Sequence, residues 1–190
     1  GNSIGGTISN NTITMTSSNP TSSTLGMFIL SGGVTKTITI TNNIVENCTL
    51  STASPFTGIL TQAGLTVPLN IVITGNTVRN NSFTATTGAA TFISNTIVAT
   101  GSVTISNNTV QNNSLAGTGI FTGIANTSTT GIPTLTVNDN TITGNTKGNT
   151  GTMSLLSYGA ANNATINNNV IHNNAVSGTT LGATVTLNCA

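Results

Sequence analysis

The feature that most constrains this chain is an internal repeat of about 32 residues. Six segments share an apolar anchor, followed three positions later by asparagine and five positions later by isoleucine or valine. The anchors are spaced by 32, 33, 32, 32 and 29 residues. Self-similarity at a fixed period indicates stacked structural units. We therefore expect the 190 residues to form one repeat domain, 1–190.

Three columns define the repeat when the six segments are aligned. The anchors are Ile8, Ile40, Ile73, Ile105, Val137 and Ile166. The asparagine column contains Asn11, Asn43, Asn76, Asn108, Asn140 and Asn169. The second apolar column contains Ile13, Val45, Val78, Val110, Ile142 and Ile171.

Around each anchor, apolar and polar residues alternate with period two, and Ile, Val and Thr predominate, which is typical of half-buried strands. No useful stretch has the 3.6-residue period of a helix. Coils stacked at the strand spacing of about 4.8 Å place each apolar column in a continuous core. The pattern predicts an all-β parallel solenoid of about six coils, about 32 residues and three strands per coil, with essentially no α-helix. The asparagines are expected to form an amide ladder at a corner.

The motif I-x-x-N-x-[IV]-x-N-N, which recurs with substitutions once per coil, resembles the repeat of pectin-lyase-like parallel β-helix proteins. The resemblance covers essentially the whole chain and is specific to architecture rather than function. It implies a right-handed solenoid with three sheets. Many members of that family are polysaccharide lyases or hydrolases, and others are adhesins, phage tailspikes and surface-layer proteins.

The composition excludes several classes of partner. Four residue types make up more than half of the chain: 42 Thr, 29 Asn, 21 Gly and 18 Ser. The five charged residues are Lys36, Glu46, Arg79, Asp139 and Lys147. Three scattered basic residues cannot neutralise a nucleic-acid backbone, so we expect no nucleic-acid partner. No apolar run is long enough to span a bilayer, so we expect no membrane insertion.

The few ionisable side chains do not form a catalytic or metal-binding set. Glu46 and Asp139 fall three coils apart, about 14 Å at the strand spacing, beyond the roughly 5–9.5 Å between paired glycosidase carboxylates. His172 has no second histidine or cysteine in register to share a metal. We therefore expect no enzyme activity, no cofactor and no metal.

Two pairs of residues predict specific contacts. Glu46 and Arg79 share an outward column in neighbouring coils, which predicts an exposed ion pair. Cys48 and Cys189 fall four coils apart, about 19 Å, whereas bridged Cα atoms lie about 4.4–6.8 Å apart. The two thiols are therefore either free or bridged between different chains.

Outward hydroxyls flank the anchors and suggest an alternative function. The threonines of this face are Thr7, Thr39, Thr41, Thr74, Thr104, Thr136 and Thr165. A flat sheet would hold them in a grid of about 4.8 by 6.7 Å. This array is similar to the faces of β-solenoid ice-binding proteins, although Val72, Asn138 and Asn167 interrupt it. Ice binding, or glycan binding by an adhesin, is the alternative reading.

The two ends of the predicted solenoid favour a structural role. No capping helix or charged terminal coil is expected, so the first and last coils present matching apolar columns. A head-to-tail contact that does not close produces a filament. The leading hypothesis is a self-stacking subunit of an extracellular or cell-surface filament, with the protein itself as partner. The other hypothesis is a fragment of a larger surface adhesin.

Overall fold

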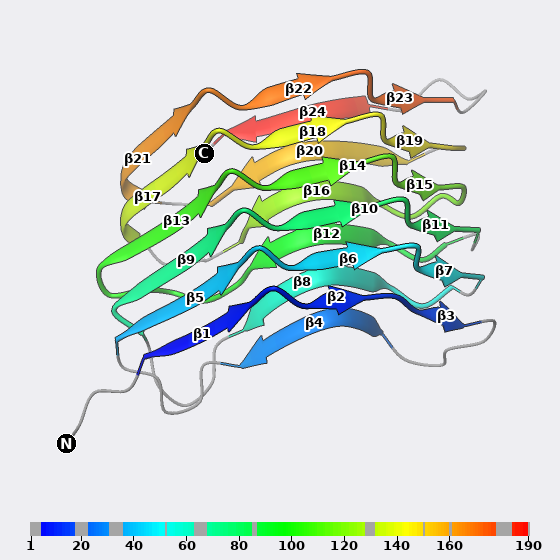
Figure 1. Cartoon of the computed structure of the whole chain (residues 1–190). Coiled ribbons are helices and arrows are strands. Elements are labelled where there is room, and N and C mark those ends of the chain that lie inside the picture. The colour runs from blue at the N-terminus through cyan, green and yellow to red at the C-terminus, as the bar shows by residue number, and fades with distance from the viewer. Residues whose placement is uncertain are drawn as a thin grey trace.

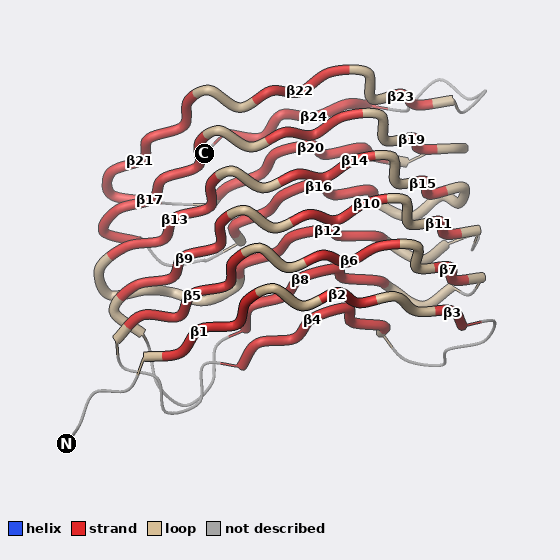
Figure 2. The backbone as a smooth tube through the Cα atoms, viewed as in Figure 1, coloured by secondary structure: helices blue, strands red, loops and turns tan. Residues whose placement is uncertain are grey.

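The computed structural model describes residues 5–17, 23–30, 36–51, 53–62, 68–84, 87–127, 132–149, 151–159, 161–177 and 184–189. All regular structure in these ranges is β-strand, as the sequence predicts. The strands stack side by side as a parallel solenoid (Figure 1). Figure 2 shows strands and loops along the traced backbone and no helix. None of the described residues forms a helix that could span a membrane.

Four parallel sheets of six strands each make up the solenoid. The first sheet contains β1 (Gly6–Ser9), β5 (Thr37–Thr41), β9 (Asn70–Thr74), β13 (Ser102–Ser106), β17 (Ile132–Asn138) and β21 (Ala161–Asn167). The second contains β2 (Thr12–Ile13), β6 (Ile44–Glu46), β10 (Thr77–Arg79), β14 (Thr109–Gln111), β18 (Thr141–Thr143) and β22 (Val170–His172). The third contains β3 (Thr16–Ser17), β7 (Thr49–Leu50), β11 (Ser82–Phe83), β15 (Ser114–Leu115), β19 (Thr146–Lys147) and β23 (Ala175–Val176). The fourth contains β4 (Thr24–Leu30), β8 (Phe56–Gln62), β12 (Ala90–Asn95), β16 (Phe121–Asn126), β20 (Thr152–Tyr158) and β24 (Thr184–Cys189).

The predicted six coils of three strands are corrected by this topology. Each repeat contributes four strands, which we call a rung. The first and last of the six strands in a sheet are separated by about five turns of chain. Six anchors mark six strands, and therefore only five intervals between them. The strand missed by the three-strand prediction is the two-residue one in the third sheet. Two residues are too few to show a period-two pattern.

Asparagine forms both corners that flank the second sheet. The first corner has left-handed backbone at Asn10, Asn42, Asn107, Asp139 and Asn168, and the second at Asn47, Asn80, Asn112 and Asn173. Glycine replaces asparagine once in each corner, at Gly75 and Gly144, again with positive φ. Asparagine and glycine adopt this conformation at lower cost than other residues. The repeated N-N pairs of the sequence are therefore corner signals.

The apolar columns lie inside the solenoid as the sequence predicts. The anchors pair across the first sheet in order from Ile8 to Ile166, and the second apolar column pairs from Ile13 to Ile171. The inner members of both columns are buried, whereas Ile8, Ile13, Ile166 and Ile171 on the outermost rungs are partly exposed. The central rungs add a phenylalanine cluster, with ring centroids 4.5 Å apart for Phe56 and Phe83.

Candidate functional site

The first asparagine ladder crosses the whole solenoid from Asn11 to Asn169. Asn76 shows the repeated geometry: its backbone N–H and its Nδ2 both donate to Asn108 Oδ1 at 3.0 Å. Its Nδ2 also donates to the carbonyl oxygen of Ile40 at 2.9 Å, in the preceding rung. Asn43, Asn76, Asn108 and Asn140 are fully buried. Each amide therefore satisfies the backbone at a corner where the strand ladder is interrupted.

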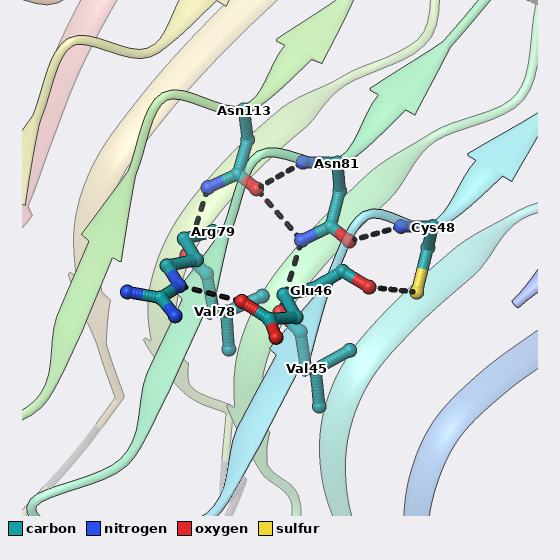
Figure 3. Close-up of polar contacts among 7 residues, drawn as sticks. All are labelled: Val45, Glu46, Cys48, Val78, Arg79, Asn81 and Asn113. Atoms are coloured by element: carbon teal, nitrogen blue, oxygen red, sulfur yellow. Dashed lines mark hydrogen bonds and ion pairs between the residues drawn. The ribbon is translucent and has the colours of Figure 1, made fainter. Parts of the chain in front are cut away.

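A second ladder runs through the other corner and was not identified from the sequence. It consists of Asn81, Asn113, Asn145 and Asn174, with Cys48 at the same place in the second rung. Asn81 Nδ2 donates to Asn113 Oδ1 at 2.8 Å, and Cys48 N–H donates to Asn81 Oδ1 at 2.9 Å (Figure 3). The sequence does contain a pattern for this ladder: its asparagine is the second residue of the N-N pair that closes the repeat motif.

A third, shorter polar stack lies in the fourth sheet. Thr61 Oγ1 donates to Asn95 Oδ1 at 2.5 Å, and Asn95 Nδ2 donates to Asn126 Oδ1 at 2.6 Å. All three residues are buried. The spacings along the chain are 34 and 31 residues, so the constant repeat period gives no signal for this stack.

The predicted ion pair is present on the outward face of the second sheet. Arg79 Nε donates to Glu46 Oε2 at 2.7 Å, from β10 to the neighbouring β6 (Figure 3). Both side chains are partly exposed, so the pair contributes about 0–1 kcal/mol. Asp139 lies at the first corner three rungs from Glu46. The described residues contain no group of three histidine, cysteine or acidic side chains that could hold a metal.

Lys147 is a lysine buried in the otherwise largely apolar core. It continues a column of Leu50, Phe83 and Leu115 in the third sheet and is 0% exposed. Its Nζ donates to the carbonyl oxygens of Gly117 and Gly148, the latter at 2.6 Å. Burial lowers the pKa of the Lys147 ammonium, because removal from water disfavours its charge.

Cys48 is a buried thiol at the end of the second ladder. The side chain is 0% exposed and no disulfide involves it. Burial raises the pKa of the Cys48 thiol, with a smaller contribution in the same direction from Glu46. A bridge from Cys48 to another chain would require this corner to open. The side chain of Cys189 lies outside the described residues, so its half of the predicted intermolecular bridge has no structural description.

The threonine face lies on the outside of the first sheet. Thr39, Thr104 and Thr136 pair in one row, which Val72 interrupts. In the second row, Thr74 Oγ1 and Ser106 Oγ lie 3.2 Å apart and hydrogen-bond to each other. Thr7 and Thr165, on the outermost strands, are the exposed members of the face. Some of the hydroxyls are therefore committed to their neighbours rather than to solvent.

Fold and site together define the class of this protein: a parallel β-solenoid held by asparagine ladders. No match was found among models of protein families, curated proteins or solved structures. The pectin-lyase-like resemblance therefore stands on the repeat motif alone.

Proposed function

We propose that this protein is a structural subunit that stacks head to tail into a filament at the cell surface or outside the cell. The observation that carries the proposal is the match between the two outermost rungs. Three columns run through every rung: the anchors, the asparagines and the second apolar residues. They end at β1 and β2 on one side of the solenoid and at β21 and β22 on the other. These columns are buried wherever a further rung covers them.

The uncharged surface supports this role. Among the described residues of the outermost rungs there is no acidic or basic side chain other than His172. Two such ends meet without charge repulsion, which otherwise keeps proteins apart. The two acidic residues of the sequence, Glu46 and Asp139, lie three rungs apart, and this separation also supports a non-enzymatic role. We extend the proposal to a right-handed winding, since parallel strand crossovers are right-handed in nearly all proteins.

Electron microscopy of the purified protein, with fibre diffraction, tests the proposal. We expect unbranched fibres with a reflection at about 4.8 Å from the strand spacing. The axial repeat should be about 29 Å, which is six rungs at that spacing. Protein that stays monomeric at high concentration would contradict the proposal. Cell fractionation of the source organism tests the surface location.

The alternative role in binding ice or glycans through the threonine face has less support. Val72 breaks one row, and the Thr74–Ser106 contact uses hydroxyls that a ligand would need. Thermal hysteresis measured on the purified protein, with Thr104→Tyr as the control, tests the ice-binding alternative. Hysteresis that Thr104→Tyr abolishes would favour the alternative.

A further inference from the structure

The first asparagine ladder has a chemical direction. In every described step, the backbone N–H and Nδ2 of one asparagine donate to the Oδ1 of the asparagine one rung closer to the C-terminus. Asn43 donates to Asn76 at 3.0 and 3.0 Å, and Asn108 donates to Asn140 at 3.0 and 3.0 Å. The Oδ1 atoms therefore accept from the first-rung side, and the backbone N–H groups donate toward the last rung.

The first rung ends in a hydrogen-bond acceptor. Asn11 donates through its N–H and Nδ2 to Asn43 Oδ1 at 3.1 and 2.9 Å, and its Nδ2 also donates to the Ser9 carbonyl. Its own Oδ1 accepts no hydrogen bond from the described residues. Asn11 is exposed, whereas the next asparagine of the ladder is buried.

The last rung ends in hydrogen-bond donors. Asn169 Oδ1 accepts from the N–H and Nδ2 of Asn140 at 3.1 and 2.9 Å, and Asn169 Nδ2 donates to the Val137 carbonyl at 2.9 Å. The backbone N–H of Asn169 has no acceptor among the described residues. In an inner rung, this N–H and Nδ2 would share the Oδ1 of the next asparagine.

Apolar side chains surround this hydrogen-bonding position at both ends. Ile8 and Ile13 flank Asn11, and Ile166 and Ile171 flank Asn169, in the same columns of the repeat. All four are only partly buried. Contact between unlike ends therefore covers apolar surface and pairs a donor with an acceptor. Contact between like ends leaves the acceptor, or the donors, without a partner, which is costly in a dry interface.

We infer that the last rung of one copy binds the first rung of a second copy with one polarity and one register. In this junction the Asn169 N–H and Nδ2 donate to Asn11 Oδ1, Ile166 packs on Ile8, and Ile171 packs on Ile13. The inference rests on the proposed function and adds the residues and the polarity of the junction. The first ladder carries the recognition, because Met15 in the first rung stands where the second ladder would need an asparagine.

Two variants that each block one end test the polarity. Gly6→Arg places a long charged side chain on the first rung, where an added Cβ meets no atom within 4 Å. Ala164→Arg does the same on the last rung, at an exposed position of the same inward column. Thr7→Arg and Thr165→Arg are the matched controls, one residue along each strand and facing outward.

The readout is the mass in solution, by sedimentation or light scattering. We expect each blocked variant alone to remain a 19.0 kDa monomer, a mixture of the two to form dimers, and both controls to polymerise as wild type does. Homodimers of either blocked variant would overturn the inferred polarity, and polymers of both would show that another surface assembles. Wild type that never polymerises would refute the proposed function itself.

A second measurement tests the asparagine contact. Asn11→Leu is introduced into the Ala164→Arg protein, whose first rung is free, and its affinity for the Gly6→Arg protein is measured. We expect a loss of about tenfold or more, as for one unpaired donor in a buried interface. Asn10→Gly in the same background is the control and should leave the affinity within about twofold, since glycine adopts the same backbone conformation. Equal affinities of the Asn11→Leu and Asn10→Gly proteins would overturn the role of the ladder.

Discussion

At the scale of the residue, adjacent asparagines have two different structural roles in this protein, in the backbone turn and in the side-chain ladder. The first asparagine of each N-N pair at a corner takes the left-handed conformation that turns the corner, as Asn107 does with φ of 55°. The second points inward and pairs with its counterparts above and below, as Asn108 does. A carboxamide has two donor hydrogens and a two-lone-pair acceptor, so it can meet all of these demands without charge.

Replacing one buried ladder asparagine should therefore be far more damaging than replacing its exposed neighbour. Asn108→Leu leaves the Asn76 N–H without its acceptor. It also removes one hydrogen bond of Asn76 Nδ2 and one of the Ile73 carbonyl. We expect a loss of about 3–5 kcal/mol in the free energy of unfolding, from one unpaired buried N–H at about 1–3 kcal/mol and two lost hydrogen bonds at about 1 kcal/mol each. Asn107→Gly, which keeps the corner conformation, should cost less than about 1 kcal/mol. Urea unfolding of both variants measures the difference, and equal losses would contradict the structural role of the ladder.

The buried Lys147 predicts a pH dependence with a definite sign. Because burial lowers its pKa, the folded chain binds fewer protons than the unfolded chain between the lowered pKa and about 10.5. The free energy of unfolding should therefore rise with pH across that window. Lys147→Met should remove this rise and leave the titration of the other groups unchanged. The measurement is the free energy of unfolding of both proteins as a function of pH, and the two slopes are compared. A wild-type slope no steeper than that of Lys147→Met would contradict the prediction.

At the scale of the element, the shortest strands depend on the ladder beside them. Each strand of the third sheet has only two residues, fewer than an independent strand normally needs. The backbone N–H just before β7, β11, β15 and β19 donates to an asparagine Oδ1 of the second ladder, as Asn81 N–H does to Asn113 Oδ1 at 3.1 Å. The side-chain ladder thus completes the hydrogen bonding at this corner.

Cys48 offers a test at this scale, because it occupies a ladder position without an amide. In Cys48→Asn, the new Nδ2 can donate to Asn81 Oδ1 and to the Ile13 carbonyl, as Asn81 donates to Asn113 Oδ1 and to the Val45 carbonyl. We expect a gain of about 1 kcal/mol in unfolding free energy, the usual net value of one hydrogen bond. Cys48→Ala, which supplies no donor, is the control and should be destabilised. Thermal unfolding ranks the two variants, and the prediction is wrong if Cys48→Asn is the less stable.

At the scale of the whole molecule, each described strand is hydrogen-bonded in its sheet to the strands of the neighbouring rungs. Stability is then a sum over rungs and the interfaces between neighbours. The same property makes the interface between rungs a template for the interface between copies. The fold and the proposed filament therefore rest on one set of contacts.

Removing one complete turn should leave a shorter protein of the same fold. Deletion of residues 74–105 joins Ile73 to Ser106 in register, because Ile73 pairs with Ile105. We expect retained β circular dichroism and a urea m-value lower by roughly one sixth, since the m-value follows the surface exposed on unfolding. Deletion of residues 74–89 removes half a turn and should abolish folding, because it joins strands of different sheets. Equal folding of both deletions would contradict a rung-by-rung structure.

The sequence by itself determined the repeat period, the parallel all-β stack, the anchor columns, the first ladder and the Glu46–Arg79 pair. These features depend on residues one period apart, and stacking at constant spacing converts that separation directly into contact. Only the tertiary structure decided the two-residue strand that each rung adds to the third sheet, the short polar stack from Thr61 to Asn126 and the burial of Lys147. Two-residue strands have no measurable period, and the polar stack has irregular spacing. A lysine enters a core only where polar partners meet its amine, and here these are the carbonyl oxygens of Gly117 and Gly148.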